Sequence, residues 1–292
     1  MELTNGVVML VISQLMNALA LASLLTIVSS GLALIFGLRD VMNLSHGALY
    51  MLGAYVGYSV TNILGFWPAL VIVPLALGLA GLALEHGVLR PLQRRSHIEV
   101  ALITFGFALV LTQIIGKIWG KAPMRMDPPI ALAGSVDLFG AHYPAYRLFL
   151  IAIGLGTCMA LAAWLKWTRL GMYTRAASQQ PEVAQMMGVN TDRLSQLVVC
   201  LGAAFAGLAG VLAGPYLSVD LGMGSAVLVM SLSIVVIGGL GSIWGAIGAA
   251  IAYAFVQVLG SVFFPWAALV VPYLLLIGVL VLRPRGFGQG RV

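Results

Sequence analysis

Long apolar segments alternate with short charged ones along most of this chain. Six apolar segments can be bounded, each close to or above the ~20 residues that a helix needs to cross a bilayer; they are residues 7–37, 47–64, 66–89, 98–116, 146–165 and 195–216. The last one opens a tract from Ser195 to Leu282 in which Asp220 is the single charged residue. That tract has room for up to about four spans of ~20 residues each. The pattern predicts an all-α, polytopic transmembrane helical bundle of about 8–9 membrane segments, with room for one re-entrant segment.

Glycine and proline positions divide the long apolar tract further. Gly222 to Gly224 and Phe264 to Trp266 are predicted turns. The glycine cluster at 238–241 marks another break. From the sequence it is either a turn at the cytoplasmic face or an unwound point within a helix.

Composition supports a membrane rather than an aqueous environment. The 292 residues are 61% hydrophobic and 8% charged, with a mean hydropathy of +1.04, whereas soluble domains carry roughly 25% charged residues. A β-barrel would show alternating segments of about ten residues, which are absent. The N-terminal MELTNG has no basic region, so residues 7–36 are predicted to be a retained helix. Residues 1–292 are therefore predicted to form one membrane domain without an appended soluble domain.

The distribution of Lys and Arg predicts the orientation, because cytoplasmic loops are enriched in these residues. If the spans alternate, one side receives eleven of the fifteen cations, namely Arg39, Arg90, Arg94, Arg95, Lys166, Arg169, Arg175, Arg193, Arg283, Arg285 and Arg291. The opposite loop, 117–147, holds the other four. We therefore expect a cytoplasmic C-terminus, and an N-terminus outside if about nine segments cross. The net charge of +6 follows from these loops, so no nucleic-acid partner is expected.

The basic segment TRLGMYTRAASQQPEVAQMMGVNTDRL, residues 168–194, has the signals of an organised structure. Pro181 and Glu182 suit the start of a short helix, and Gly188 suits its C′ position. Val183, Met186 and Met187 share one face of that helix, and Asn190, Thr191 or Asp192 can cap the next helix. The Met-containing face suits docking into a partner groove. Contact with lipid headgroups and packing on the chain's own bundle remain alternatives.

Polar residues crowd into GLRDVMNLSHGALYMLGAYVG at 37–57. Arg39 and Asp40 are expected to form a screened pair at the end of the first helix, and Ser45 to cap the second. Polar groups near membrane depth usually face a cavity or a partner. Asn43, His46 and Tyr50 are therefore candidates for the translocation pathway or its inner gate, the alternative being a polar turn between two helices.

Small residues recur at four-residue spacing and predict close helix–helix contact. The predicted packing positions are Gly53, Gly57, Gly202, Ala206, Gly210, Gly214, Gly241 and Gly245. Packing within the chain is one interpretation, and a subunit interface or the lining of a conduit is the other.

These motifs together resemble the membrane permease subunit of the branched-chain (hydrophobic) amino-acid ABC importer family. The resemblance in the coupling loop, about residues 168–194, rests on Arg175, Ala176, Gln179, Ala184, Gly188, Val189 and Asn190. The 31–55 stretch, GAAFAGLAGVLAGP (202–215) and VVIGGLGSIWGAIGAA (235–250) extend it over essentially the whole chain. Gln180-Pro181 departs from the family pattern, in which an Asp often follows the Gln, and should alter the start of the short helix.

The resemblance implies an alternating-access conduit in a bacterial inner membrane, formed with a second, related or identical permease subunit. It implies two cytoplasmic ATPase subunits, which use ATP and Mg, and an extracytoplasmic solute-binding protein that docks on 118–146 and the turn near Asp220. The resemblance and the pattern of the short helix together predict the positions for ATPase coupling, namely Arg175, Ala176, Gln179, Glu182, Val183, Met186, Met187, Gly188 and Asn190. Branched-chain amino acids are the expected substrates, with urea, short amides and aromatic acids as alternatives.

Other functions find less support in the sequence. The Gly-Lys pairs at 116–117 and 120–121 lack the flanks of a phosphate-binding loop, so the chain is expected to bind no ATP or other cofactor itself. It has no HExxH motif and no metal-ligand spacing, so neither catalytic nor metal-binding residues are predicted. An ion-coupled secondary transporter or a channel is the main rival, but such a carrier typically needs a carboxylate deep in a span. Glu85, near a helix end, is the nearest candidate.

Overall fold

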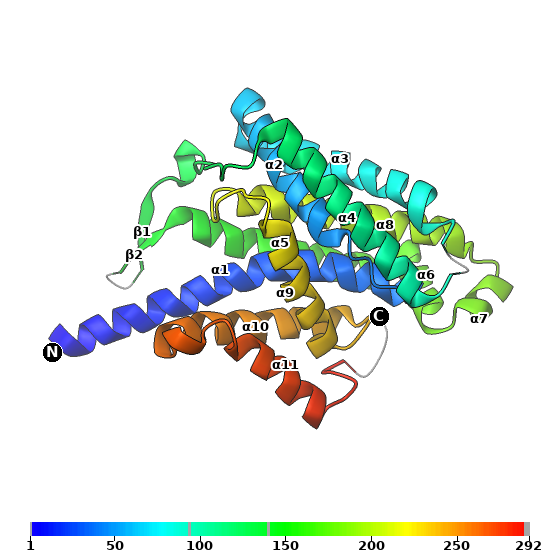
Figure 1. The fold of residues 1–292 in the computed structure, drawn as a ribbon. Helices are drawn as coiled ribbons and strands as arrows, with labels where there is room; N and C mark the ends of the chain where they lie inside the picture. Colours follow the sequence, from blue (N-terminus) through cyan, green and yellow to red (C-terminus); the bar gives the residue numbers. More distant parts are fainter. Residues whose placement is uncertain (1, 93–94, 139–140, 289–292) are drawn as a thin grey trace.

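The computed structural model describes residues 2–92, 95–138 and 141–288, which form a bundle of helices (Figure 1). The N-terminal half contains α1 (Glu2–Arg39), α2 (His46–Leu64), α3 (Phe66–Leu84), the π-helix η1 (Glu85–Leu89) and α4 (His97–Trp119). A linking segment follows with η2 (Ile130–Leu132), β1 (Ser135–Leu138) and β2 (Ala141–Pro144). The rest contains α5 (Ala145–Trp167), α6 (Arg169–Gln179), α7 (Pro181–Met186), α8 (Thr191–Ala213), α9 (Met223–Gly238), α10 (Ile243–Phe263), η3 (Pro265–Ala267) and α11 (Val271–Leu282).

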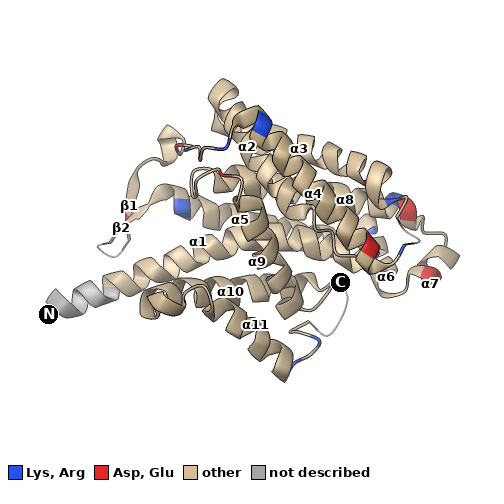
Figure 2. Ribbon diagram, in the orientation of Figure 1, with Lys and Arg blue, Asp and Glu red and all other residues tan. Residues whose placement is uncertain are grey.

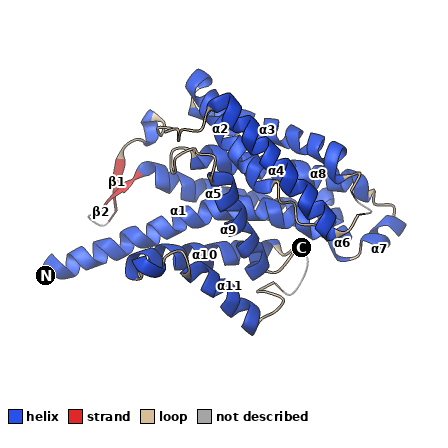
Figure 3. Ribbon diagram, viewed as in Figure 1, coloured by secondary structure: helices blue, strands red, loops and turns tan. Residues whose placement is uncertain are grey.

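Helices account for nearly all regular structure in the described residues, as Figure 3 shows. The β1–β2 hairpin is antiparallel, with Ser135 opposite Pro144 and Leu138 opposite Ala141. We call the end of the bundle that carries this hairpin the hairpin end, and the end that carries α6 and α7 the α6–α7 end. The predicted all-α polytopic fold is confirmed.

Six helices of the described chain are long and apolar enough to cross a membrane. They comprise Met9–Arg39, Phe66–Leu89, His97–Trp119, Ala145–Trp167, Thr191–Ala213 and Ile243–Phe263. The apolar helices α9 and α11 are shorter than the ~20 residues of a full span. Lipid is the environment that these surfaces require, because large apolar side chains are exposed along α3, α4 and α5. The protein is a multi-pass membrane protein.

Helix α8 lies at the centre of the bundle and packs against α1, α2 and α3. The two backbones meet directly in its contact with α2: a Cβ added at Gly53 would lie 2.7 Å from the Gly207 Cα, and one added at Gly210 would overlap the Tyr50 carbonyl oxygen. Small residues allow this approach, which in lipid supplies the packing energy that hydrophobic burial supplies in water.

The other predicted packing residues divide into two groups. On α2 and α8, Gly57 lies against Val211, Gly202 lies against Ile35 of α1, and Ala206 is fully buried. The remaining three occupy other settings. Gly214 ends α8 and lies against Met126 of the segment that follows α4, Gly245 of α10 lies against the Gly238 carbonyl oxygen, and Gly241 is in a turn.

The break at 238–241 is a turn between α9 and α10 rather than an unwound point within a helix. Gly239 and Gly241 have φ values of +94° and +82° there, which glycine adopts without the strain that a Cβ would cause. Gly241 therefore serves the turn and not a helix–helix contact, which corrects the prediction. The C-terminal segment closes over this turn, because the backbone N–H groups of Phe287 and Gly288 donate to the Ile237 and Gly238 carbonyl oxygens. The predicted turn at 264–266 is confirmed as η3.

Lys and Arg residues lie mostly near the ends of the helices (Figure 2). At the α6–α7 end, Arg39 is the last residue of α1, Arg90 follows η1, and Arg193 lies in the first turn of α8. Arg94 and Arg291, which contributed to the predicted orientation, lie outside the described residues.

Candidate functional site

The segment 168–194 forms two short helices whose ends follow local rules. Thr168 caps α6 by accepting a hydrogen bond from the Gly171 N–H at 3.0 Å. Pro181 is the first residue of α7, as predicted, and Gly188 follows that helix with φ +86°. Asn190 caps α8, because its Oδ1 accepts from the Arg193 N–H at 3.0 Å. The predicted start, stop and cap of this segment are therefore confirmed.

Helix α7 presents an apolar face to the surroundings of the chain. Val183, Met186 and Met187 are 49%, 83% and 81% exposed. On the opposite side, Ala184 is buried and packs in a small cluster with Leu194 of α8. These three residues lie between the candidate spans Ala145–Trp167 and Thr191–Ala213, and the rest of the described bundle leaves them exposed.

The other predicted coupling residues flank this face. Ala176, Gln179 and Glu182 are exposed, whereas Arg175 is half-buried and donates a hydrogen bond to the Leu165 carbonyl oxygen at the end of α5. A hollow of about 390 Å³ adjoins the same surface. Its walls are Leu170, Tyr173, Met187, Gly188, Val189, Asn190, Arg193, Leu194 and Leu197. The surface is thus apolar at its centre, polar at its rim and hollowed on one side.

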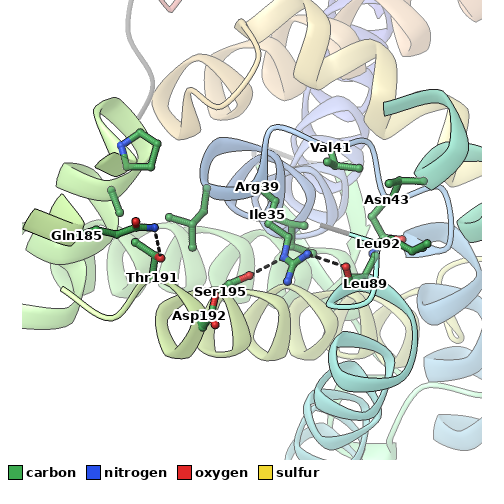
Figure 4. A pocket seen from close by; sticks show the side chains of 14 residues that line it. Ile35, Arg39, Val41, Asn43, Leu89, Leu92, Gln185, Thr191, Asp192 and Ser195 are labelled. Carbon is green, nitrogen blue, oxygen red and sulfur yellow. Dashed lines mark hydrogen bonds between the residues drawn. The ribbon is translucent and has the colours of Figure 1, made fainter. Parts of the chain in front are cut away.

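A cavity of about 240 Å³ lies behind α7, between that helix and the ends of α1 and η1 (Figure 4). Pro181 and Gln185 of α7 form one wall, while Arg39 and Asn43 contribute from the region of α1. Across the cavity rim, Gln185 Nε2 donates to Thr191 Oγ1 at 2.8 Å and links α7 to the start of α8 (Figure 4).

The far wall of this cavity contains a cluster that joins three helical segments. The Arg39 guanidinium forms an ion pair with the Glu85 carboxylate of η1, in which the two side chains are 10% and 1% exposed. Arg39 Nε donates to Ser195 Oγ of α8 at 2.5 Å, and Nη1 donates to the Leu89 carbonyl oxygen at 3.2 Å. The guanidinium is therefore bound by Glu85, Ser195 and Leu89, which corrects the predicted screened pair with Asp40.

The pathway candidates Asn43, His46 and Tyr50 are all buried inside the bundle. His46 Nε2 donates to the Val28 carbonyl oxygen of α1 at 3.0 Å. Asn43 Oδ1 accepts from the backbone N–H of Ser45 at 3.1 Å and from its hydroxyl at 2.5 Å. The Ser45 side chain makes no capping bond to α2, so that expectation is wrong. Of the three candidates, Asn43 lines the cavity behind α7.

A second arginine cluster lies at the hairpin end. The guanidinium of Arg147, in the first turn of α5, lies 6.0 Å from the ring centroid of Tyr143 and 5.5 Å from that of Tyr216. Arg147 and Tyr143 both donate to Asn17 Oδ1 of α1. Burial raises the pKa of the Tyr143 and Tyr216 phenols, so both remain neutral at physiological pH. Sequence reasoning missed this cluster because Asn17 and Tyr216 are far along the chain from Tyr143 and Arg147.

The sequence of this chain is similar to those of known proteins. A family model described as the branched-chain amino acid transport system permease component matches residues 14–280. The chain belongs to this family. Escherichia coli (strain K12) holds two similar proteins, both called high-affinity branched-chain amino acid transport system permease proteins. LivH is 25% identical, with 94% of each chain covered, and LivM is 28% identical, with 89% of this chain and 66% of LivM covered.

A solved structure supports the fold of this permease independently. The structure described as PsaBC from Streptococcus pneumoniae in complex with Fab is similar at a TM-score of 0.50 and 15% sequence identity. The similarity covers 91% of this chain and 89% of the other. At this identity the likeness concerns the arrangement of helices alone.

Proposed function

We propose that this permease is the membrane subunit of an ATP-driven importer for branched-chain or related amino acids, and that α7 docks an ATPase subunit. One observation carries the proposal, namely the exposed apolar face formed by Val183, Met186 and Met187 at the α6–α7 end. Exposed apolar patches outside a membrane mark contact with a partner, and Met-rich faces adapt well to a groove. ATP hydrolysis is assigned to the partner, with α7 transmitting its movement.

The proposed orientation places the α6–α7 end in the cytoplasm of a bacterial cell, with the permease in the inner (plasma) membrane. Arg39, Arg90, Arg169, Arg175 and Arg193 all belong to this end, in agreement with the positive-inside rule. If α2, α9 and α11 also cross, nine segments place the N-terminus outside and the C-terminus inside. The short α9 and α11 then need partner helices or tilted neighbours to complete their crossings.

The proposed assembly contains a second permease subunit, two ATPase subunits and an extracytoplasmic solute-binding protein. The presence of both LivH and LivM in one organism supports a pair of related permeases. The segment 118–146 and the turn near Asp220, at the hairpin end, are the proposed contact for the binding protein. The family match and the coupling segment favour this importer over an ion-coupled carrier, a channel or an intramembrane enzyme.

Asn43, His46 and Tyr50 are proposed to border the pathway when alternating access separates α1, α2 and α8. Their burial in this conformation is consistent with a closed inner gate. Replacing His46 with Ala removes its bond to Val28. Assembly should persist while uptake in proteoliposomes slows, and wild-type uptake by this variant would refute the pathway role.

Co-purification with the ATPase subunits tests the proposed function. All subunits are expressed together, and the permease is isolated in mild detergent as wild type or with Val183→Asp and Met187→Asp combined. We expect the ATPase to remain with the wild type and to be lost from the double variant, because two carboxylates would be buried in an apolar contact. Leu240→Asp is the matched control, since Leu240 is also exposed but lies in the α9–α10 turn. If no ATPase binds the wild type with all partners present, the importer function fails.

A further inference from the structure

The geometry points to a mechanical joint at Arg39, Glu85 and Ser195, through which movement of α7 reaches α1 and the α3–η1 segment. The inference rests on the proposed function, because it concerns how work done at α7 opens and closes the conduit. The three residues act as positioning residues, since they hold helices and need not touch substrate.

The first step runs from α7 to α8. Only Met187 to Asn190 separate the two helices, and the Gln185–Thr191 hydrogen bond ties them side chain to side chain. The Asn190 cap fixes the first turn of α8. Ser195 lies about one helical turn beyond Thr191. A displacement of α7 therefore moves Ser195 as well, because the short connecting loop absorbs little of the movement.

The second step runs from α8 to α1 and η1. The Arg39 guanidinium binds Ser195 through Nε, the Leu89 carbonyl through Nη1 and the Glu85 carboxylate through Nη2, so one planar group holds three segments. Breaking a buried ion pair leaves an uncompensated charge, so this cluster resists separation. Glu85 and Leu89 bound a π-helix, an irregularity that occurs frequently at functional sites.

The cavity behind α7 supplies room for the movement. Its volume of about 240 Å³ lies between α7 and the cluster, whereas α8 is closely packed along its contact with α2. On its wall, Asn43 Nδ2 has no hydrogen-bond partner among the described residues. In the Arg39 cluster, Glu85 Oε2 likewise has no hydrogen-bond partner within the described part of the chain. Helix α7 can thus shift into a space lined by both polar and apolar residues, while the cluster moves as a unit.

A nearby pair provides an internal control. Arg90 Nη2 and Asp192 Oδ2 are 3.5 Å apart and also link the end of η1 to α8, but their side chains are 48% and 51% exposed. Exposed pairs contribute little stability. If the joint depends on the buried cluster, removing the Arg90–Asp192 pair should leave coupling unchanged.

The experiment compares substrate uptake with ATP hydrolysis in proteoliposomes that contain the complete transporter and its binding protein, with leucine as the probe. Ser195→Ala removes the bond to α8 while leaving the Arg39–Glu85 pair intact. We expect assembly and ATPase rate to stay near wild type and thermal stability to fall only slightly. Leucine transported per ATP should fall about tenfold, the scale set by losing a hydrogen bond to a charged group. Ser195→Thr, which keeps the hydroxyl, should restore the ratio, and Arg90→Gln should not change it. Glu85→Gln should lower it further.

The outcomes separate this inference from the proposed function. Leucine uptake driven by ATP in the wild type supports the proposed function, and its absence overturns both. With the wild type active, an unchanged ratio in Ser195→Ala overturns the joint alone. A loss in Ser195→Ala that Ser195→Thr does not rescue also overturns it, because the hydroxyl would then not be the cause. Equal losses in Ser195→Ala and Arg90→Gln would show a general loosening of α8 and would overturn it as well.

Discussion

Helix α8 follows α7 directly in the chain, but the contact of α8 with α2 and the exposed surface of α7 are built on opposite principles. Between α2 and α8, side chains are reduced to hydrogen so that backbones meet, as at Gly53 and Gly207. On the α7 surface, by contrast, large flexible side chains such as Met186 and Met187 extend outward and are 83% and 81% exposed. The first surface is complete within the chain, and the second requires a partner. The Arg39–Glu85–Ser195 cluster lies where the two regions meet.

The largest effect is expected at the close-packed contact. Gly210→Leu places its Cβ against the Tyr50 carbonyl oxygen, and backbone cannot give way as a side chain can. We expect a loss of at least about 3 kcal/mol in the free energy of unfolding, at or above the usual range for overpacking. Thermal unfolding in detergent measures it. Gly156→Leu is the control, because a Cβ at Gly156 of α5 meets open space; equal losses in both variants would contradict the contrast.

A smaller effect is expected at α7, and on binding instead of folding. Met187→Ala removes an exposed side chain, so the thermal stability of the permease should not change. Truncating an interface side chain should weaken ATPase docking by about 1–2 kcal/mol, or roughly tenfold. Titration of the ATPase onto nanodisc-held permease measures this. A drop in stability with unchanged affinity would show that Met187 stabilises the fold and does not bind the ATPase. The contrast between the α7 surface and the α2–α8 contact would then be wrong.

Asn190→Ala tests the boundary between the two regions. The variant loses the hydrogen bond from the Arg193 N–H, and capping residues contribute about 1 kcal/mol. We expect a small decrease in unfolding temperature, measured on the purified permease. Asn190→Ser should recover most of it, since Ser also caps helices well. A wild-type unfolding temperature for Asn190→Ala would show that the start of α8 is held by other contacts.

The smallest effect is expected for Met186→Leu. The change conserves volume and apolarity at an exposed position, so stability should change by less than about 0.5 kcal/mol. ATPase affinity should also stay within a factor of about two to three, because an adaptable apolar face tolerates a similar side chain. A large loss of affinity in the same titration would indicate a shape-specific pocket for the Met186 side chain.

Local sequence signals predicted the surface features of the candidate site well. The Pro181 start of α7, the Gly188 stop and the Asn190 cap each depend on the residue type and its contacts within a few residues along the chain. The shared face of Val183, Met186 and Met187 was predicted from their spacing, whereas the structure shows that the bundle leaves this face exposed instead of packing it. The apolar segments predicted the membrane helices for the same reason, since their length is set by the bilayer.

The sequence by itself therefore determined the helices, their membrane environment and the shape of the coupling segment. The tertiary structure decided which polar groups meet. Arg39 binds Glu85 and Ser195, 46 and 156 residues away, rather than its neighbour Asp40. The Ser45 hydroxyl binds Asn43 instead of capping α2, and Gly241 turns the chain instead of packing a helix. The partners of Arg39 depend on how helices far apart in sequence are placed, because burial removes water as an alternative partner and leaves each polar group to bind what packing brings near it.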